Sequence, residues 1–383
     1  MRIVYLANIR LPTERAHGYQ IVRTCAALVQ HHVEIELVVP KRRNPKLDGE
    51  DVFAYYGIRP KFSIRWLPSL DLIRGNLYRV IGPLAFWLQT WTFARSVRKY
   101  LATASQDSLV YSRDELLMDV VGRIRQRLVL ELHALPSPRY RRLLDRADRI
   151  VVIAQAIMDG LVGQGIGGDK IVVAADAADV QPPSDLPNRE VVRTQLGLPT
   201  DCKIAVYTGH PYPWKGVFRL AEASRFLADD WRVVMIGGVP RDLKPLQNYV
   251  DRHHLQRVSV ISHMERDHLI AFLAAADVLV LPNTSQDDRS RLYTSPLKLF
   301  EYLAAGRPIV ASDLPSIREI VSEQEVIFVR PDDNKDLARG IREAGETDQS
   351  ARITAAQALA KKYTWEGRAK IILHALQATL QKT

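Results

Sequence analysis

The stretch YTSPLKLFEYLAAGRPIVASDLPSIREI, residues 293–320, predicts a helix that is followed at once by a buried strand. Ser295 is a favoured N-cap residue and Pro296 a favoured first helical residue. Gly306 suits the first position after a helix, and the apolar run 308–312 is the expected strand. The inward face of the helix carries three apolar residues at helical spacing: Leu297, Phe300 and Leu303. The backbone N–H groups that follow Ser295 are therefore expected to face the carboxyl end of a sheet.

Short apolar runs alternate with helical patterns along the rest of the chain. In the first half the expected strands are 2–7, 33–39, 62–67, 108–112, 128–132, 149–154 and 170–174. In the second half they are 203–209, 231–237, 258–262, 277–282, 308–312 and 326–329. The helical patterns fall at about 18–30, 216–228, 241–254, 265–275, 296–305, 315–322, 335–345 and 349–382. This α/β alternation predicts βαβ units, with a parallel sheet in each half that is covered on both faces.

The length of 383 residues predicts two domains. Residues 181–200 contain four prolines among polar residues, which is typical of a linker between domains. The sequence thus indicates an N-terminal domain at 1–180 and a C-terminal domain at 201–350. A helical segment at 351–383 is expected to pack back toward the N-terminal domain.

The segment TGHPYPWKG, residues 208–216, has the features of an anion-binding loop. Gly209 follows the end of a strand, and a glycine lets the backbone approach a ligand closely. Lys215 and Gly216 open a helix, whose N-terminus offers free N–H groups and the positive end of the helix dipole. The combination suits a diphosphate, although the spacing is not that of a P-loop. The alternative is that Lys215 is an exposed lysine in a first helical turn.

Glu301 lies about one and a half turns into the helix of the opening stretch. A carboxylate in this position accepts hydrogen bonds from both hydroxyls of a ribose, as acidic residues do in nucleotide sites. The alternative is a solvated residue on the outer face of the helix.

Together the two segments resemble the retaining glycosyltransferases of family four (glycosyl transferases group 1). That resemblance implies the GT-B fold, two Rossmann-like parallel-sheet domains that face each other across a cleft. The family binds its donor diphosphate with a glycine, a basic residue and a lysine–glycine pair, which match Gly209, His210 and Lys215–Gly216. Its second signature is two glutamates separated by seven residues, of which Glu301 with YLAAGRPIVAS matches the second. MIGGVP (235–240) and TWEGRAK (364–370) also resemble segments of the family.

The resemblance implies a set of donor-binding residues. Those expected to meet the donor phosphates are Gly18, Gly209, His210, Lys215, Ser295 and Leu297. Those expected to meet the nucleotide and its ribose are Gly237, His263 and Glu301.

The sequence departs from the family pattern at three places. Tyr293 stands where the first glutamate is expected, and His210 where an arginine is expected. Thr294, Ser295 and Pro296 replace the usual glycines before the helix. Because the first glutamate of the family touches the donor sugar, its loss leaves the identity of that sugar open and admits an inactive protein.

In the N-terminal half, the family implies a loop after the first strand that meets donor phosphates and acceptor. His17 and Gly18 lie in this loop, residues 12–20. His133 follows the strand 128–132, and the resemblance places it beside the donor sugar, as a catalytic residue together with Lys215. Arg113 ends a neighbouring strand and is expected to meet an anionic acceptor. The alternative is that the histidines and Arg113 are ordinary loop residues.

The net charge of +10 is uneven, with about +8 in residues 1–180 and about +2 in the rest. A basic excess in one half indicates an anionic partner there. The segment 77–102 combines aromatic residues with flanking arginines and a lysine, which fits either a helix on a membrane surface or an amphipathic helix docked on the sheet. The N-terminus lacks a signal-peptide cleavage site and no run is long enough to span a membrane, so we expect a cytoplasmic protein, peripheral on the inner face of the membrane.

The expected reaction transfers a hexose from a UDP- or GDP-linked sugar to a hydroxyl of a lipid-linked or saccharide acceptor. The family implies retention at the anomeric carbon, and neither a metal nor another cofactor is expected, because Lys215 and a helix N-terminus take the place of the metal. Cys25 and Cys202 do not have a metal-ligand spacing. Two alternatives share the architecture: a nucleotide-sugar 2-epimerase and a non-catalytic nucleotide-sugar-binding protein. Nucleic-acid binding is not expected, because no recognised binding motif accompanies the basic half.

Overall fold

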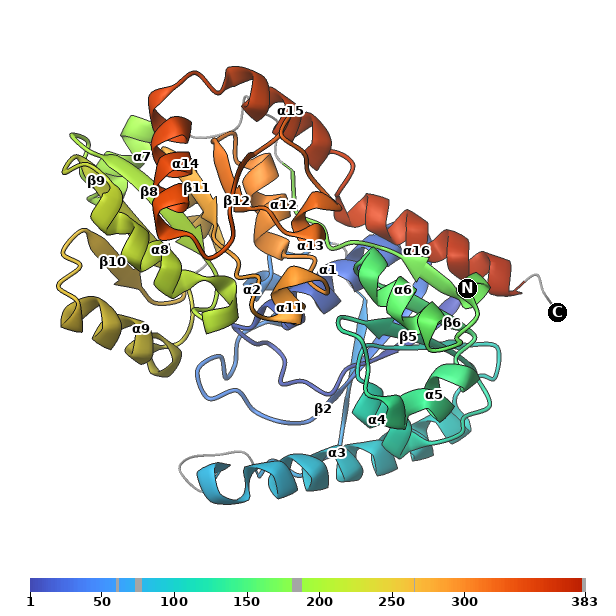
Figure 1. The fold of residues 1–383 in the computed structure, drawn as a ribbon. Coiled ribbons are helices and arrows are strands. Elements are labelled where there is room, and N and C mark those ends of the chain that lie inside the picture. The colour runs from blue at the N-terminus through green and yellow to red at the C-terminus, as the bar shows by residue number, and fades with distance from the viewer. Residues whose placement is uncertain (60–61, 73–77, 181–187, 265, 381–383) are drawn as a thin grey trace. The chain divides into compact units, whose positions relative to one another are not determined.

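The computed structural model describes residues 1–383 except 60–61, 73–77, 181–187, 265 and 381–383 (Figure 1). The chain forms two compact units. Unit 1 comprises residues 1–174 and 365–383, and unit 2 comprises residues 175–364. Each unit is built around one parallel sheet, and each is described here by itself.

Unit 1 contains a seven-stranded sheet of order β3-β2-β1-β4-β5-β6-β7. Its strands are β1 (Arg2–Leu6), β2 (Glu34–Pro40), β3 (Ser63–Leu67), β4 (Leu109–Ser112), β5 (Arg127–Leu132), β6 (Arg149–Val152) and β7 (Ile171–Val173). Its helices are α1 (Ala16–Gln30), α2 (Val52–Tyr55), α3 (Tyr78–Thr103), α4 (Glu115–Val121), α5 (Arg141–Arg146), α6 (Gln155–Gly163) and α16 (Trp365–Leu380). The central strands are buried along their length, as expected for a parallel sheet covered on both faces.

Unit 2 contains a six-stranded sheet of order β10-β9-β8-β11-β12-β13. Its strands are β8 (Lys203–Thr208), β9 (Trp231–Ile236), β10 (Val258–Ile261), β11 (Val278–Leu281), β12 (Ile309–Ser312) and β13 (Ile327–Val329). Its helices are α7 (Arg189–Leu196), α8 (Val217–Ala223), α9 (Pro240–Arg252), α10 (Arg266–Ala275), α11 (Asp288–Arg291), α12 (Leu297–Ala304), α13 (Pro315–Arg318), α14 (Asn334–Glu346) and α15 (Ser350–Ala360). Every strand that the sequence predicts is present, with ends that differ by at most two residues. The predicted class, two Rossmann-like parallel-sheet domains, is confirmed.

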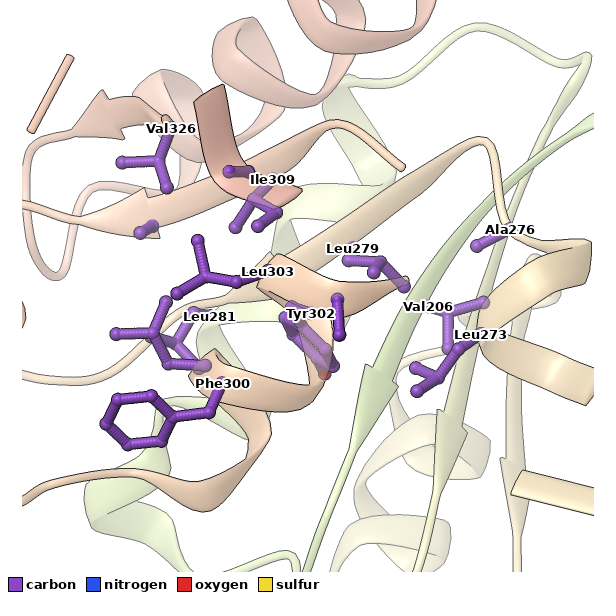
Figure 2. Close-up of a cluster of buried hydrophobic side chains, with 14 of the residues drawn as sticks. Val206, Leu273, Ala276, Leu279, Leu281, Phe300, Tyr302, Leu303, Ile309 and Val326 are labelled. Atoms are coloured by element: carbon purple, nitrogen blue, oxygen red, sulfur yellow. The ribbon is translucent and has the colours of Figure 1, made fainter. Parts of the chain in front are cut away.

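Helix α12 is fixed to the sheet of unit 2 by its apolar face. Phe300, Tyr302 and Leu303 are fully buried, and Figure 2 shows them in one cluster with β-strand side chains such as Leu281. Burial of one side chain of this size stabilises the fold by about 1.5–3 kcal/mol. The Tyr302 hydroxyl also accepts a hydrogen bond from the backbone N–H of Thr208, at 2.8 Å. The start of α12 is thereby held beside the carboxyl end of β8.

The predicted cap of this helix was wrong by one residue. Pro296 is the N-cap of α12, and Leu297 is the first helical residue. The hydroxyl of Ser295 instead accepts a hydrogen bond from the backbone N–H of Asp176, at 2.9 Å. A tertiary contact therefore overrides the local preference of serine for the cap position. The prediction for Gly306 is confirmed, since its φ of 67° is the left-handed conformation expected just after a helix.

The C-terminal helical pattern 349–382 divides into two helices that belong to different units. Helix α15 packs on α12 in unit 2, whereas α16 packs on α1 in unit 1. Between them Thr364 forms a short parallel bridge with Ala178, whose N–H donates to the carbonyl of Tyr363 at 3.0 Å. This pairing interrupts the helical pattern, because the backbone carbonyl of Tyr363 bonds to Ala178 and not to a residue further along a helix.

The boundary between the units lies at residues 174–175, before the segment 181–200 that we interpreted as a linker. Residues 181–187 of that segment lie outside the described part of the chain. Residues 189–196 form α7, which packs on α10 within unit 2.

Candidate functional site

The carboxyl end of β8 is the point where the strand order of unit 2 reverses direction. From β8 the strand order runs through β9 to β10 on one side. The chain then returns to add β11, β12 and β13 on the other side of β8. Parallel α/β sheets bind ligands at such a point, outside the carboxyl ends of the strands. The segment that follows β8 is the anion-binding loop expected from the sequence.

Two glycines bring adjacent loops into close contact here. Gly209 follows β8 with a φ of 124°, and Gly237 follows β9 with a φ of 123°, a region that side chains disfavour. A methyl group added at Gly237 would lie 2.8 Å from the carbonyl oxygen of Gly209. The N–H of His263, after β10, donates to the carbonyl of Gly238 at 2.9 Å. Three consecutive strand ends thus form one backbone-lined edge, which includes the predicted nucleotide-binding Gly237 and His263.

Lys215 ends a short 3-10 turn, Pro213–Lys215, between β8 and α8. A methyl group added at Gly209 would lie 3.9 Å from its Nζ, so the ammonium group stands beside the glycine loop. Burial lowers the pKa of Lys215 to about 8. Gly216, with a φ of 73°, has its α-carbon against the carbonyl of Pro282, which a methyl group would approach to 1.7 Å. Only glycine fits there, and this close packing fixes the turn that carries Lys215.

His210 begins a row of aromatic rings along this loop. Its ring stacks on Tyr212 with 5.4 Å between centroids, and Tyr212 stacks on Trp214 with 6.1 Å. The imidazole Nε2 lies 3.8 Å from a carboxylate oxygen of Asp242. The Nζ of Lys215 lies 5.1 Å from the ring centre of Trp214, a cation–π distance. The aromatic row therefore flanks the lysine.

Lys298, which the sequence did not single out, lies in the same place. It is the second residue of α12 and only 6% exposed. Its Nζ would lie 3.8 Å from a methyl group at Gly209, nearly the same distance as that of Lys215. A lysine one turn before the buried Tyr302 was the available signal, because residues four apart share a helix face.

The predicted ribose ligand Glu301 is partly buried and accepts a hydrogen bond from the guanidinium of Arg266 at 2.9 Å. Arg266 also lies 3.5 Å from a carboxylate oxygen of Asp179. These residues line a pocket whose other walls are apolar residues of α10 and α12. Glu301 is thus not a solvated surface residue. Ser295 and Leu297 lie at the start of the same helix, where Ser295 is buried and its hydroxyl engaged.

In unit 1, His133 belongs to a buried polar cluster at the carboxyl end of β5. Its Nε2 lies 2.6 Å from Oε1 of Glu131, which is 3% exposed. The same carboxylate accepts a hydrogen bond from the Tyr111 hydroxyl at 2.5 Å and lies 3.0 Å from Nη2 of Arg368, on α16. Burial alone would raise the pKa of Glu131, but the Arg368 charge and the His133 hydrogen bond hold it well below its ordinary value. His133 is therefore oriented by a permanently ionised carboxylate.

The other predicted residues of unit 1 lie directly after β4 and in the first turn of α1. Arg113 donates a hydrogen bond to the side chain of Gln20 at 2.9 Å, and its charge contributes to the lowered pKa of Glu131. His17 is a partly buried residue of α1. Gly18 is buried within α1, and a methyl group there would lie 2.4 Å from Thr13 and 2.5 Å from the Tyr56 hydroxyl. Close side-chain packing therefore requires this glycine.

Only some of the aromatic residues of α3 belong to the core, where the alternative of a helix docked on the sheet places them. Phe93 is fully buried, but four large apolar side chains are exposed: Leu84, Phe86, Trp87 and Trp91. Arg95 and Lys99 are exposed further along the helix. Among the described residues no helix is both long and apolar enough to cross a bilayer. The described residues also contain no cluster of three histidine, cysteine or acidic side chains suited to a metal ion.

Residues 202–346 match the model of the family described as glycosyl transferases group 1. The chain is 29% identical over 153 residues to TuaC of Bacillus subtilis, which is assigned as a glycosyltransferase of teichuronic acid biosynthesis. That match covers 40% of this chain and 36% of TuaC. It is 26% identical over 257 residues to the D-inositol 3-phosphate glycosyltransferase of Xylanimonas cellulosilytica, covering 62% of this chain and 60% of that protein. The chain thus spans less than two thirds of these curated relatives.

The fold also matches that of HepE from Anabaena, whose structure contains UDP and glucose. The TM-score is 0.75 at 18% identity, and the match covers 99% of this chain and 100% of HepE. A likeness at this identity establishes the fold, and the GT-B class expected for the two sheets agrees with it. The two curated relatives are glycosyltransferases by name, as is the family whose model matches residues 202–346.

Proposed function

We propose that this chain is a glycosyltransferase that moves a hexose from a nucleoside diphosphate sugar to a hydroxyl acceptor, with retention of the anomeric configuration. The observation that carries the proposal is the glycine-lined edge at the end of β8, with the Lys215 ammonium beside Gly209. A diphosphate needs exactly such a close backbone and a positive charge. The relatives TuaC and D-inositol 3-phosphate glycosyltransferase, and the structural neighbour HepE in complex with UDP and glucose, support the assignment.

In the proposed reaction, negative charge develops on the β-phosphate as the nucleoside diphosphate leaves. Lys215 and the free N–H groups at the start of α12 stabilise that charge. Donors fixed in advance of the reaction contribute several kcal/mol to such a step. The departing phosphate takes the acceptor's proton, so no side chain is required as a general base. We propose that the step uses neither a metal nor a cofactor, because the lysine and the helix N-terminus supply the positive charge.

We also propose that His133 contacts the donor sugar and that Arg113 serves the acceptor. The contact with ionised Glu131 orients the His133 ring and favours a proton on the nitrogen that faces the carboxylate. The opposite nitrogen is then free to accept a hydrogen bond from a sugar hydroxyl.

The acceptor is proposed to be lipid-linked or part of a growing polysaccharide, met at an anionic membrane surface. The exposed face of α3 supports this proposal, because Trp87 and Trp91 stand one turn apart with Arg95 and Lys99 beyond them. Aromatic side chains at a bilayer interface combined with basic residues are typical of peripheral attachment. Flotation with vesicles of phosphatidylglycerol and phosphatidylcholine tests it. Replacing both tryptophans with serine should abolish flotation, whereas Phe226→Ser, an equally exposed residue of unit 2, should not.

A donor screen tests the proposed activity. Purified protein is incubated with UDP-, GDP- and ADP-sugars and a membrane extract as the acceptor source, and nucleoside diphosphate release is measured. Lys215→Met should lose most release while melting normally. Lys203→Met, the matched control at the other end of β8, should retain it. If the protein binds none of the three nucleoside diphosphates, the proposal is wrong. Binding without turnover would instead assign the non-catalytic function that Tyr293 in place of the glutamate admits.

A further inference from the structure

The side chain of Lys298 is buried in unit 2 without an acceptor for its N–H groups. Only 6% of the residue is exposed, and Nζ has no hydrogen-bond partner in the described part of the chain. The ring of Tyr207 lies against it, with 3.9 Å between Nζ and the ring centre. The ring attracts the charge but supplies no oxygen for the three donors. A buried ammonium group in this state is costly unless a ligand completes its surroundings.

The buried end of Lys298 points to the spot already marked by Lys215. The two Nζ atoms lie within 4 Å of a single point, the position of a methyl group added at Gly209. They reach it from different elements, one from the turn after β8 and the other from the first turn of α12. A charge on Lys215 disfavours a second charge on Lys298, and a ligand of the opposite charge would stabilise both in the protonated form.

We propose that Lys298 is a second ligand of the donor diphosphate, and that both lysines contact it beside Gly209. The inference rests on the proposed function, which it deepens by giving the site two cations where the sequence indicated one. Tyr207, against which the amino group packs, is uncharged, and Glu301 on its own helix is paired with Arg266. The carboxylate nearest in sequence is therefore already engaged.

The charges around Lys298 agree with this geometry. Burial, and then the charge of Lys215, lower its pKa well below the ordinary value, and Glu301 offsets this only in part. A bound diphosphate reverses the balance, because its negative charge favours the protonated form. The site is therefore poised to gain positive charge when the anion enters.

Calorimetric titration of the full chain with UDP, GDP and ADP, and with the corresponding nucleosides, tests the inference. Lys298→Met keeps the length and apolar stem of the side chain and removes the charge. We expect this variant to bind the tightest-binding nucleoside diphosphate with roughly ten- to a hundredfold lower affinity. That range corresponds to the loss of one charge-assisted hydrogen bond. Affinity for the nucleoside should stay unchanged, as should both affinities in Lys203→Met. Because Lys298→Met removes a buried amino group that lacks a hydrogen-bond partner among the described residues, its melting temperature should equal or exceed that of the wild type.

The outcomes separate this inference from the function on which it rests. One outcome is that the wild type binds a nucleoside diphosphate with an affinity that Lys215→Met lowers and Lys298→Met leaves unchanged. In that case Lys298 is a structural cation–π partner of Tyr207, and the inference is wrong while the proposed function stands. If the wild type binds none of the three, both fail. Should Lys298→Met not fold, Lys298→Gln, which retains a polar end, replaces it in the same titration. Equal loss of nucleoside and diphosphate affinity would also contradict a role at the phosphates.

Discussion

Replacing Arg368 with methionine tests the buried charge cluster that joins α16 to β5. Arg368 and Glu131 have side chains that are 2% and 3% exposed, and their charged atoms lie 3.0 Å apart. The variant leaves the carboxylate buried without its principal counter-charge. Removing one partner of such a pair costs about 3–5 kcal/mol, because the remaining ion keeps its desolvation penalty. For a unit of this size, that is a fall in melting temperature of between about 6 and 20 °C.

The pH dependence of this loss identifies its cause. In the wild type the pKa of Glu131 is held well below its ordinary value, so its contribution to stability is present at neutral pH and lost only in acid. Without Arg368, burial acts with less opposition and raises that pKa. A carboxyl group with a raised folded-state pKa stabilises the fold below its unfolded pKa and destabilises it as the pH rises through the folded value. Arg368→Met should therefore lose less stability at pH 5 than at pH 8.

Differential scanning calorimetry measures both effects. The control is Lys370→Met on the same helix, which breaks an ion pair with Glu366 of only 2.6 Å whose side chains are 61% and 56% exposed. An exposed pair contributes about 0–1 kcal/mol, so this variant should melt close to the wild type despite the shorter distance. The reasoning is refuted if the two variants melt alike, or if the loss in Arg368→Met is the same at both pH values.

Three further predictions concern unit 2. Glu301→Gln should weaken nucleoside and nucleoside diphosphate binding equally in calorimetry, by about tenfold, because the ribose is common to both; a loss confined to the diphosphate would contradict that assignment. Gly216→Ala should lower the melting temperature strongly, since its methyl group would collide with a backbone carbonyl, whereas Gly197→Ala has the same left-handed backbone with open space and should lose only about 1 kcal/mol. Diphosphate affinity should fall as the pH rises from about 7 to 9, because the pKa of Lys215 is about 8, and Lys215→Met should flatten that profile; an unchanged profile would place the titrating group elsewhere.

The strands could be predicted because their signal is local. Each is a short apolar run that remains buried in a parallel sheet, so the residues themselves reveal the element and its ends. The loop after β8 could be predicted for a similar reason, since Gly209, Lys215 and Gly216 follow one strand within eight residues. The prediction that was wrong, the N-cap role of Ser295, concerns a residue whose partner is distant in the sequence. Ser295 contacts Asp176, and no local preference reveals that hydrogen bond.

The cluster around Glu131 shows the same limit more clearly. Its partners come from β4, from the residue after β5 and from α16, and Arg368 is more than two hundred residues away in the chain. The sequence shows only a glutamate in an apolar strand, which by itself resembles an unfavourable burial. Lys298 is the opposite case, because a lysine in an amphipathic helix is normally solvated. The structure shows that this side chain turns inward, where it packs on the ring of Tyr207.

The net charge of each half does not reveal the anion site that we propose in unit 2. Unit 2 lies in the nearly neutral part of the sequence, but neutrality there comes from paired side chains such as Arg318 with Asp313 and Arg339 with Asp336. Such exposed pairs cancel at short range and contribute little to any binding site. No ion pair of Lys215 or Lys298 is found within the described residues, and burial lowers the pKa of both, so a bound anion would favour their charged forms. An anion site is therefore identified by cations that lack a counter-charge, and a total over the domain conceals them.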